Sequence, residues 1–241
     1  LMRAKRFISK ERQPHMNHIF LDLLKNNLNH AEVFNSQFDH LQESQQPDAV
    51  TICCSDSRVL QDHIWGNNEP GQLFSCGNIG NRVMQQTDSG EVVSGDILYP
   101  IVHTGTKTAI VMGHTGCGAV TATYDSLQKE LSEPAGINHC LDLLKPHLQP
   151  ALELLPDSIN RAGTVNRLVE YNVDRQIDIL RQSTDVPDDV DCLGVVYDFQ
   201  DVYSGQRGEI HVVNINGETD TETLRAENPE IASRIERLWA Y

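Results

Sequence analysis

The chain has 241 residues, 39% of them hydrophobic, and a formal net charge of −15 at pH 7. This composition supports a sizeable core, and no apolar run approaches the ~20 residues that span a bilayer. Nucleic acids and anionic membranes are bound by basic surfaces, so the acidic composition argues against both as partners. The charge fits either an ordinary acidic protein or adaptation to high salt.

The first 15 residues carry five basic side chains against Glu11 alone. They lack the apolar segment of a signal peptide, so we expect a protein that is not exported and works in the cytoplasm. We interpret residues 1–15 as a disordered arm or an extension introduced during cloning, with a transit peptide as the weaker alternative. Residues 16–241 are then expected to form a single domain.

Six cysteines are too few for a disulfide scaffold in a chain of this length: Cys53, Cys54, Cys76, Cys117, Cys140 and Cys192. Without a signal peptide, their thiols are expected to stay reduced. The cysteines therefore indicate either metal binding or packing in the core.

Hydrophobic periodicity predicts the elements of the amino-terminal half. Residues 18–42 have the pattern of one helix, or of two in series. The following elements are predicted as a strand over 49–52, a short helix over 59–65, a strand over 72–76, a helix over 91–103 and a strand over 108–112.

The carboxyl-terminal half continues the alternation. We predict a helix that opens at 116–119, helical pieces over 125–163 broken by prolines, an amphipathic helix over 160–182, strands over 192–199 and 209–216, and a helical end over 221–241. The fold class is therefore α/β. It is expected to have a central, mainly parallel sheet with an antiparallel edge strand, flanking helices and a long N-terminal helical arm.

Two short blocks follow predicted strands, Cys53-Cys54-Ser55-Asp56-Ser57-Arg58 and Gly113-His114-Thr115-Gly116-Cys117-Gly118. In open α/β sheets, ligands bind outside the carboxyl ends of the strands, where both blocks would lie. Cys54, His114 and Cys117 would then supply two thiolates and one imidazole, a set that suits zinc and leaves one tetrahedral position free.

Neighbouring residues qualify this interpretation. Cys53 should point to the opposite face of its strand, so it is interpreted as a packing residue, together with Cys76, Cys140 and Cys192. The three glycines of the second block would let the backbone turn tightly. Asp56 and Arg58 lie beside the open metal position. The alternative is that Asp56 and Ser57 cap a helix at Val59 and that Arg58 forms a surface ion pair.

Several separated segments carry a family resemblance. The signature is Cys54-Ser55-Asp56-Ser57-Arg58 with His114-x-x-Cys117. Further matching segments are Gly71-Gln72-Leu73-Phe74, Asn78-Ile79-Gly80-Asn81, Glu170-Tyr171-Asn172-Val173-x-x-Gln176 and Gly194-Val195-Val196-Tyr197-Asp198. Together, over about residues 45–216, they resemble the β-class carbonic anhydrases.

The resemblance implies a zinc enzyme that interconverts carbon dioxide and bicarbonate through zinc-hydroxide attack. It places one Zn²⁺ per chain on Cys54, His114 and Cys117. Asp56 would orient the nucleophile, and Arg58 would hold Asp56 ionised and away from the metal. The positions that match the substrate pocket are Gln45 (or Gln46), Phe74, Ile79 and Tyr99, partly across a dimer interface, with Gly118 giving access to the metal.

The resemblance also implies a homodimer or a dimer of dimers, with the helices over residues 19–41 packing on the partner. Ordinary core packing is the alternative for Phe74, Ile79 and Tyr99. His63 could relay protons, although a solvated or capping histidine is the favoured interpretation.

Two departures from the family pattern bear on regulation. Gly77 stands where many members have arginine, and Thr51 stands where members with an inhibitory bicarbonate site have tryptophan. We therefore expect the constitutively open form. The alternative functions are hydrolysis of carbonyl sulfide or carbon disulfide on the same scaffold, and a non-catalytic, zinc-stabilised assembly protein.

Overall fold

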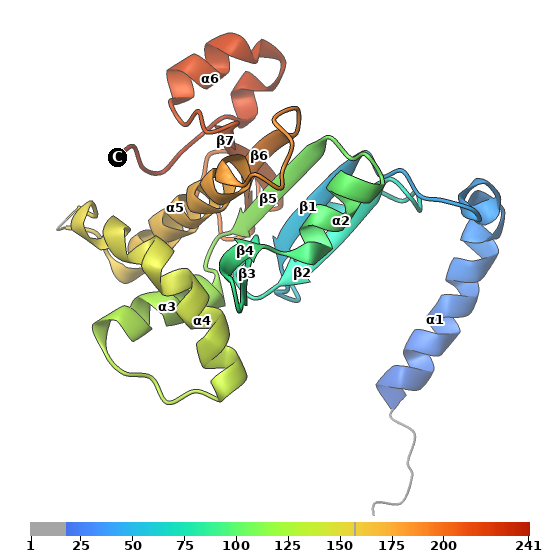
Figure 1. Cartoon of the computed structure of the whole chain (residues 1–241), viewed down its shortest axis with the longest axis horizontal. Helices are drawn as coiled ribbons and strands as arrows, with labels where there is room; N and C mark the ends of the chain where they lie inside the picture. Colours follow the sequence, from blue (N-terminus) through green and yellow to red (C-terminus); the bar gives the residue numbers. More distant parts are fainter. Residues whose placement is uncertain (1–17, 157) are drawn as a thin grey trace, which may run out of the picture. The chain divides into compact units, whose positions relative to one another are not determined.

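The computed structural model describes residues 18–156 and 158–241 (Figure 1). The expected basic arm at residues 1–15 lies outside this range. Contacts divide the chain into two compact units, residues 1–44 and residues 45–241. A single domain over 16–241 stays a prediction.

The first unit contains the helical arm that the sequence predicts. Helix α1 (His18–Phe34) is followed by the 3-10 helix η1 (Asn35–Leu41). No residue of α1 is buried within the described chain. Several of its apolar side chains are exposed, among them Phe20, Leu23, Leu24 and Leu28. An exposed apolar face of this kind is typical of a helix that packs on a partner.

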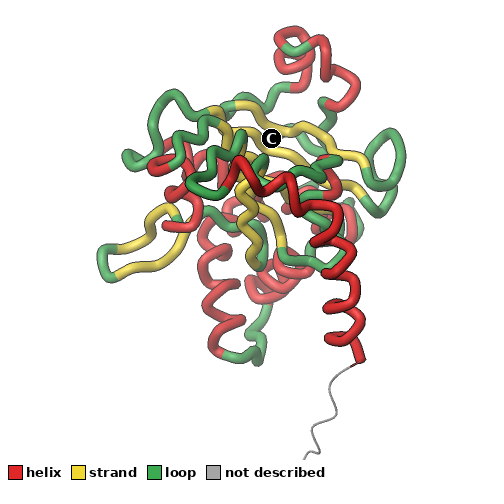
Figure 2. The backbone as a smooth tube through the Cα atoms, turned by 90° about the vertical axis from the view of Figure 1, so that its right-hand side faces the viewer, coloured by secondary structure: helices red, strands yellow, loops and turns green. Residues whose placement is uncertain are grey.

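A five-stranded sheet forms the centre of the second unit, in the order β2-β1-β5-β6-β7 (Figures 1 and 2). The strands are β1 (Ala49–Cys54), β2 (Leu73–Asn78), β5 (Thr108–His114), β6 (Asp191–Asp198) and β7 (Glu209–Ile215). All neighbours are parallel except β6 and β7, which are antiparallel. The predicted fold class is confirmed.

A separate hairpin contradicts one predicted element. Strands β3 (Met84–Thr87) and β4 (Gly90–Val93) pair antiparallel, so the predicted helix over 91–103 begins only at Gly95. The two-residue turn at Asp88 and Ser89 leads into Gly90, which has a φ of 111°, and Thr87 Oγ1 donates a hydrogen bond to the Gly90 carbonyl. This turn reverses the chain and commits residues 90–93 to strand pairing.

Helices flank the sheet, as Figure 2 shows with helices in red and strands in yellow. They are α2 (Gly95–His103), α3 (Gly118–Gln128), α4 (Ala135–Leu148), α5 (Arg161–Gln182) and α6 (Thr221–Glu227), with the 3-10 helices η2 (His63–Trp65), η3 (Gln149–Glu153) and η4 (Pro229–Arg234). Among the described residues, no helix is both long and apolar enough to cross a membrane.

Three helix predictions differ from the structure in where the helices form or end. Of the helix predicted over 59–65, only the single turn η2 forms. Pro146 does not end the helix as predicted. It lies inside the last turn of α4, where its missing N–H removes one hydrogen bond. The carboxyl-terminal end is helical only in α6 and η4. The prediction for α5 holds closely, because Asn160 caps it by accepting a bond from the Gly163 amide at 2.8 Å.

The two faces of the sheet have separate cores. Cys54 belongs to the large cluster that α5 covers with Leu168, Val173 and other apolar side chains. Cys53 belongs to a smaller cluster with Met112, Val59 and Val195. The two adjacent cysteines therefore point to opposite faces, as the strand alternation predicts.

Helix α5 also carries a buried carboxyl group. Glu170 is fully buried and accepts hydrogen bonds from the Tyr203 hydroxyl at 2.6 Å and the Leu238 amide at 2.7 Å. Burial raises the pKa of Glu170 from 4.5 to about 7, and this outweighs the opposing effect of Arg237. The neutral form is thus the one that the folded protein favours.

This shift predicts a pH-dependent stability difference between the protein and its Glu170→Gln variant. The stabilisation by neutral Glu170 is complete below pH 4.5 and is lost as the pH rises through about 7. The variant should therefore gain stability relative to wild type by up to about 3 kcal/mol between pH 5 and pH 9. Urea unfolding of both proteins measures this difference. Parallel stability curves across this range would show that Glu170 does not titrate as argued.

Candidate metal centre

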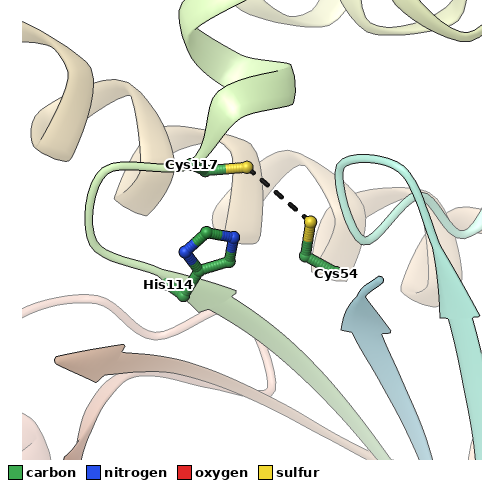
Figure 3. A group of neighbouring side chains, drawn as sticks. All are labelled: Cys54, His114 and Cys117. Carbon is green, nitrogen blue, oxygen red and sulfur yellow. Dashed lines mark hydrogen bonds between the residues drawn. The ribbon is translucent and has the colours of Figure 1, made fainter. Parts of the chain in front are cut away.

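Three side chains meet where two strands end and a helix begins. Cys54 is the last residue of β1, His114 is the last residue of β5, and Cys117 immediately precedes α3. Strands β1 and β5 are parallel neighbours, with Cys53 opposite Met112, so their carboxyl ends lie side by side. The structure thus brings the three predicted ligands together (Figure 3).

The donor atoms of this group form a compact, buried cluster. The sulfur atoms of Cys54 and Cys117 are 3.9 Å apart, and all three potential ligand atoms lie within 4.8 Å of one another. Among the described residues, no other group of three or more such side chains has this geometry. The spacing is one in which a single small ion can contact all three donors.

The loop between His114 and Cys117 depends on Gly116. Its φ of 63° is a left-handed conformation, and a Cβ there would collide with the side chain of Gln200. Gly113 is needed for a different reason than the predicted tight turn. A Cβ on it would lie 2.8 Å from Val169 and 2.9 Å from Val173, so glycine lets α5 pack against β5. The tight turn is therefore confirmed at Gly116 alone.

The imidazole of His114 is held with one nitrogen free to bind. Its Nδ1 lies 3.0 Å from the carbonyl oxygen of Thr115, to which it donates as the N–H tautomer. Its Nε2 is buried and has no hydrogen-bond partner within the described residues. A buried polar nitrogen without a partner is costly. The lone pair of Nε2 is therefore available to a cation, which is the arrangement found in histidine metal ligands.

The two thiols share their environment unequally. The hydrogen bond from Cys117 lowers the pKa of Cys54, and His114 and the Gly80 amide act in the same direction. The same contact, together with burial, raises the pKa of Cys117, although the Val120 and Ala119 amides at the start of α3 oppose this. One thiolate forms readily, and the second needs a nearby cation. This donor set suits Zn²⁺.

Asp56 and Arg58 form a close ion pair beside the cluster. Arg58 Nε lies 2.8 Å from Asp56 Oδ1, and Nη2 lies 2.7 Å from Oδ2. These bonds hold the pKa of Asp56 well below its usual range. Asp56 Oδ2 is 3.8 Å from the free Nε2 of His114. No helix begins at Val59, whose amide instead closes a turn on the Asp56 carbonyl at 2.9 Å, so a helix-capping role is wrong for Asp56 and Ser57.

The predicted pocket residues are distributed over a longer stretch of the sheet. Ile79 directly follows Asn78, the residue paired with Cys54, and is 42% exposed. Phe74 pairs with Val50, which lies roughly 13 Å along the strand from Cys54. The ring of Tyr99 is 6.1 Å from that of Phe74 and is about half-exposed. The aromatic pair is therefore together, but away from the thiols of the same chain.

Gln45 and Gly118 lie at open positions. Gln45 is exposed. A Cβ on Gly118 would meet no atom within 4 Å, so the space beside Cys117 is clear. The assignment of these residues to the substrate pocket stays a prediction.

Sequence reasoning assigned no supporting role to the polar residues of α5, although Asn172 and Gln176 belong to a segment that carries the family resemblance. Asn166 accepts a hydrogen bond from the Gly116 amide at 2.8 Å. Asn172 donates to the Gly80 carbonyl at 3.1 Å, and Gln176 accepts from the Val83 amide at 2.9 Å. The available signal was the presence of amide side chains among the apolar positions of the buried helix face. Such residues need internal partners.

A second support comes from the end of β6. The carboxylate of Asp198 accepts hydrogen bonds from the Thr115 hydroxyl at 3.1 Å and from the amides of Gln200, Val202 and Tyr203. Burial alone would raise the pKa of Asp198, but these bonds lower it. An ionised Asp198 thus fixes the loop next to His114.

Comparison with known proteins places this geometry in context. A family model described as carbonic anhydrase matches residues 49–206, more than half of the chain. The carbonic anhydrase of Helicobacter pylori strain J99 is 35% identical over 102 residues, which cover 42% of this chain and 46% of that protein. The carbonic anhydrase of Pseudomonas aeruginosa is 31% identical over 145 residues, covering 60% of this chain and 63% of that protein.

These matches span between about half and two thirds of the curated relatives' own length. Among solved structures, one of two tetrameric β-carbonic anhydrases from Sordaria macrospora superposes with a TM-score of 0.68 at 24% identity. That superposition covers 82% of this chain and 98% of the other. It shows a common fold.

Proposed function

Because the chain belongs to the β-class carbonic anhydrase family, we propose that it catalyses the reversible hydration of carbon dioxide to bicarbonate and a proton. One Zn²⁺ per chain would be held by Cys54, His114 and Cys117. The observation that carries this proposal is the buried cluster of two sulfur atoms and an imidazole nitrogen that has no hydrogen-bond partner in the described part of the chain. A cytoplasmic location stays a prediction from the composition of the amino end.

The proposed chemistry assigns distinct tasks to the neighbouring residues. Zn²⁺ bound at this cluster would supply Lewis-acid activation of water at neutral pH. Asp56 would accept a hydrogen bond from the attacking water and orient its lone pair towards carbon dioxide. Arg58 keeps the Asp56 carboxylate ionised, so that it acts as an acceptor throughout the neutral range. The proton is then released to buffer.

Substrate binding in this proposal uses an apolar pocket with one amide. Phe74, Ile79 and Tyr99 would enclose the linear substrate, Gln45 would supply the amide, and Gly118 would leave the approach clear. Phe74 lies roughly 13 Å along the sheet from Cys54 of its own chain, and Tyr99 of α2 is beside it, which supports a role of this pair in the site of a partner copy.

We further propose a homodimer or a dimer of dimers, with the exposed apolar face of α1 packing on the partner. The Sordaria macrospora relatives are tetrameric. Analytical ultracentrifugation of the full chain tests the assembly, and a monomer at micromolar concentration would contradict it.

A stopped-flow assay of the zinc-loaded protein tests the reaction. The chain should accelerate carbon dioxide hydration far above the rate of buffer, and a chelator-treated sample should lose this activity. Turnover of carbonyl sulfide or carbon disulfide without carbon dioxide hydration would favour the hydrolase alternative. A zinc-loaded protein that is inactive on all three substrates would leave only a zinc-stabilised assembly protein.

A further inference from the structure

Phe199 contacts both components of the candidate site. Its ring centroid lies 5.5 Å from that of His114, with the planes tilted by 25°. The guanidinium carbon of Arg58 lies 4.4 Å from the centre of the same ring. One aromatic side chain thus connects a proposed metal ligand to the arginine that holds Asp56.

The backbone places this ring with little freedom. Phe199 follows directly after β6, and its amide donates to Thr115 Oγ1 at 3.3 Å. Asp198, the preceding residue, accepts a bond from the same hydroxyl. Because Thr115 also adjoins His114, the ring and the imidazole are positioned by one set of bonds.

Arg58 has few other restraints. Its side chain is 52% exposed, and among the described residues its guanidinium donates hydrogen bonds to the carboxylate of Asp56. Its two hydrogen bonds to Asp56 fix the end of the guanidinium, but solvent reaches much of the rest of the side chain. The aromatic face of Phe199 adds a cation–π contact on the guanidinium, which restricts where the arginine can go.

The position of Arg58 matters because Asp56 has two competing partners. Its Oδ2 lies 2.7 Å from Arg58 and only 3.8 Å from His114 Nε2, the atom that would face the metal. A small movement of the Asp56 carboxylate would replace its bond to Arg58 by a bond to the metal. Whatever holds Arg58 in place therefore favours the state in which Asp56 stays off the metal.

We propose that Phe199 is a positioning residue that keeps Arg58 on Asp56 and so keeps the fourth metal position open. This inference rests on the proposed function because it needs the bound metal. What it describes is the equilibrium of Asp56 between Arg58 and that metal. Removing the aromatic face should shift that equilibrium towards carboxylate ligation by roughly 2- to 30-fold, the range of a cation–π contact.

The visible absorption of the Co²⁺-substituted protein tests this, because its bands change when a carboxylate replaces water as ligand. Phe199→Leu and Phe199→Met keep an apolar side chain without a ring, and Phe199→Tyr keeps the ring as the matched control. The Leu and Met variants should shift the spectrum, and the Tyr variant should match wild type. In an Asp56→Asn background, Phe199→Leu should cause no further shift.

Three results would overturn the inference. They are an unchanged spectrum in folded Phe199→Leu, a shift that persists without Asp56, and unfolding of both the Leu and the Met variants, which would assign the ring a structural role. The readout needs no turnover. A Phe199-dependent shift in an inactive protein would therefore support the inference while contradicting the proposed activity, and an active protein without the shift would do the reverse.

Discussion

The Cys54→Ala variant is expected to lose its bound zinc and its hydration activity, whereas Cys53→Ala should keep both. The two residues are adjacent, equally typical of a buried strand, and both buried. They differ in direction, since only Cys54 faces Cys117 and His114. This makes Cys53 a matched control for the effect of removing a buried thiol from β1.

The size of the effect follows from the share of one ligand in metal binding. Four-ligand zinc sites have apparent binding free energies of about 10–16 kcal/mol, or roughly 2.5–4 kcal/mol for each ligand. Loss of Cys54 should therefore weaken zinc binding by roughly 70- to 900-fold. In this variant, the Nε2 of His114 and the sulfur of Cys117 are the two donors of the cluster that remain. Two positions of a four-coordinate zinc ion then have no donor from this cluster.

Zinc content after dialysis, measured by mass spectrometry alongside the hydration rate, checks this prediction. Cys53→Ala loses only a small apolar group from its cluster, so its cost should appear in stability. If Cys54→Ala retained one zinc per chain, or if Cys53→Ala lost it, the proposed ligand set would be wrong.

The sequence was informative about this site because strand periodicity is a local property. Alternation along β1 separates Cys53 from Cys54, and both ligand blocks follow apolar runs that are typical of interior strands. The carboxyl ends of parallel neighbours meet at one edge, so convergence of Cys54 and His114 was predictable once the strands were identified. The same logic gave the fold class.

Long-range side-chain partners were not predictable in this way. The partners of Asn166, Asn172 and Gln176 emerge only when the loops at Gly116, Gly80 and Val83 are placed against α5. The stacking of Phe199 on Arg58 joins residues 141 positions apart, and no local pattern encodes it. The β3–β4 hairpin was missed because Val92 and Val93 also fit a helix that starts early.

Asp56→Asn is expected to lower kcat/KM for carbon dioxide hydration by about 100-fold or more while leaving zinc content unchanged. The variant keeps the shape of the side chain but replaces one acceptor oxygen by an NH2 donor and removes the negative charge that strengthens the hydrogen bond from the nucleophile. Misplacing a reacting group by about 1 Å can cost roughly 100-fold in rate. Asp56 is not among the three clustered donors, so metal retention should not depend on it.

Exposed Asp88, in the turn of the β3–β4 hairpin, provides the control, and Asp88→Asn should have wild-type activity. The pH profile adds an independent check. Arg58 holds the pKa of Asp56 far below neutrality, so titration of Asp56 should not contribute an inflection to the wild-type profile near pH 7. A second variant tests the partner of Asp56. Replacing Arg58 by glutamine removes the bonds that keep Asp56 away from the metal, so this variant should have a lower hydration rate even though Asp56 is present.

Full activity in Asp56→Asn, with zinc bound, would show that the carboxylate only anchors Arg58 and takes no part in the reaction.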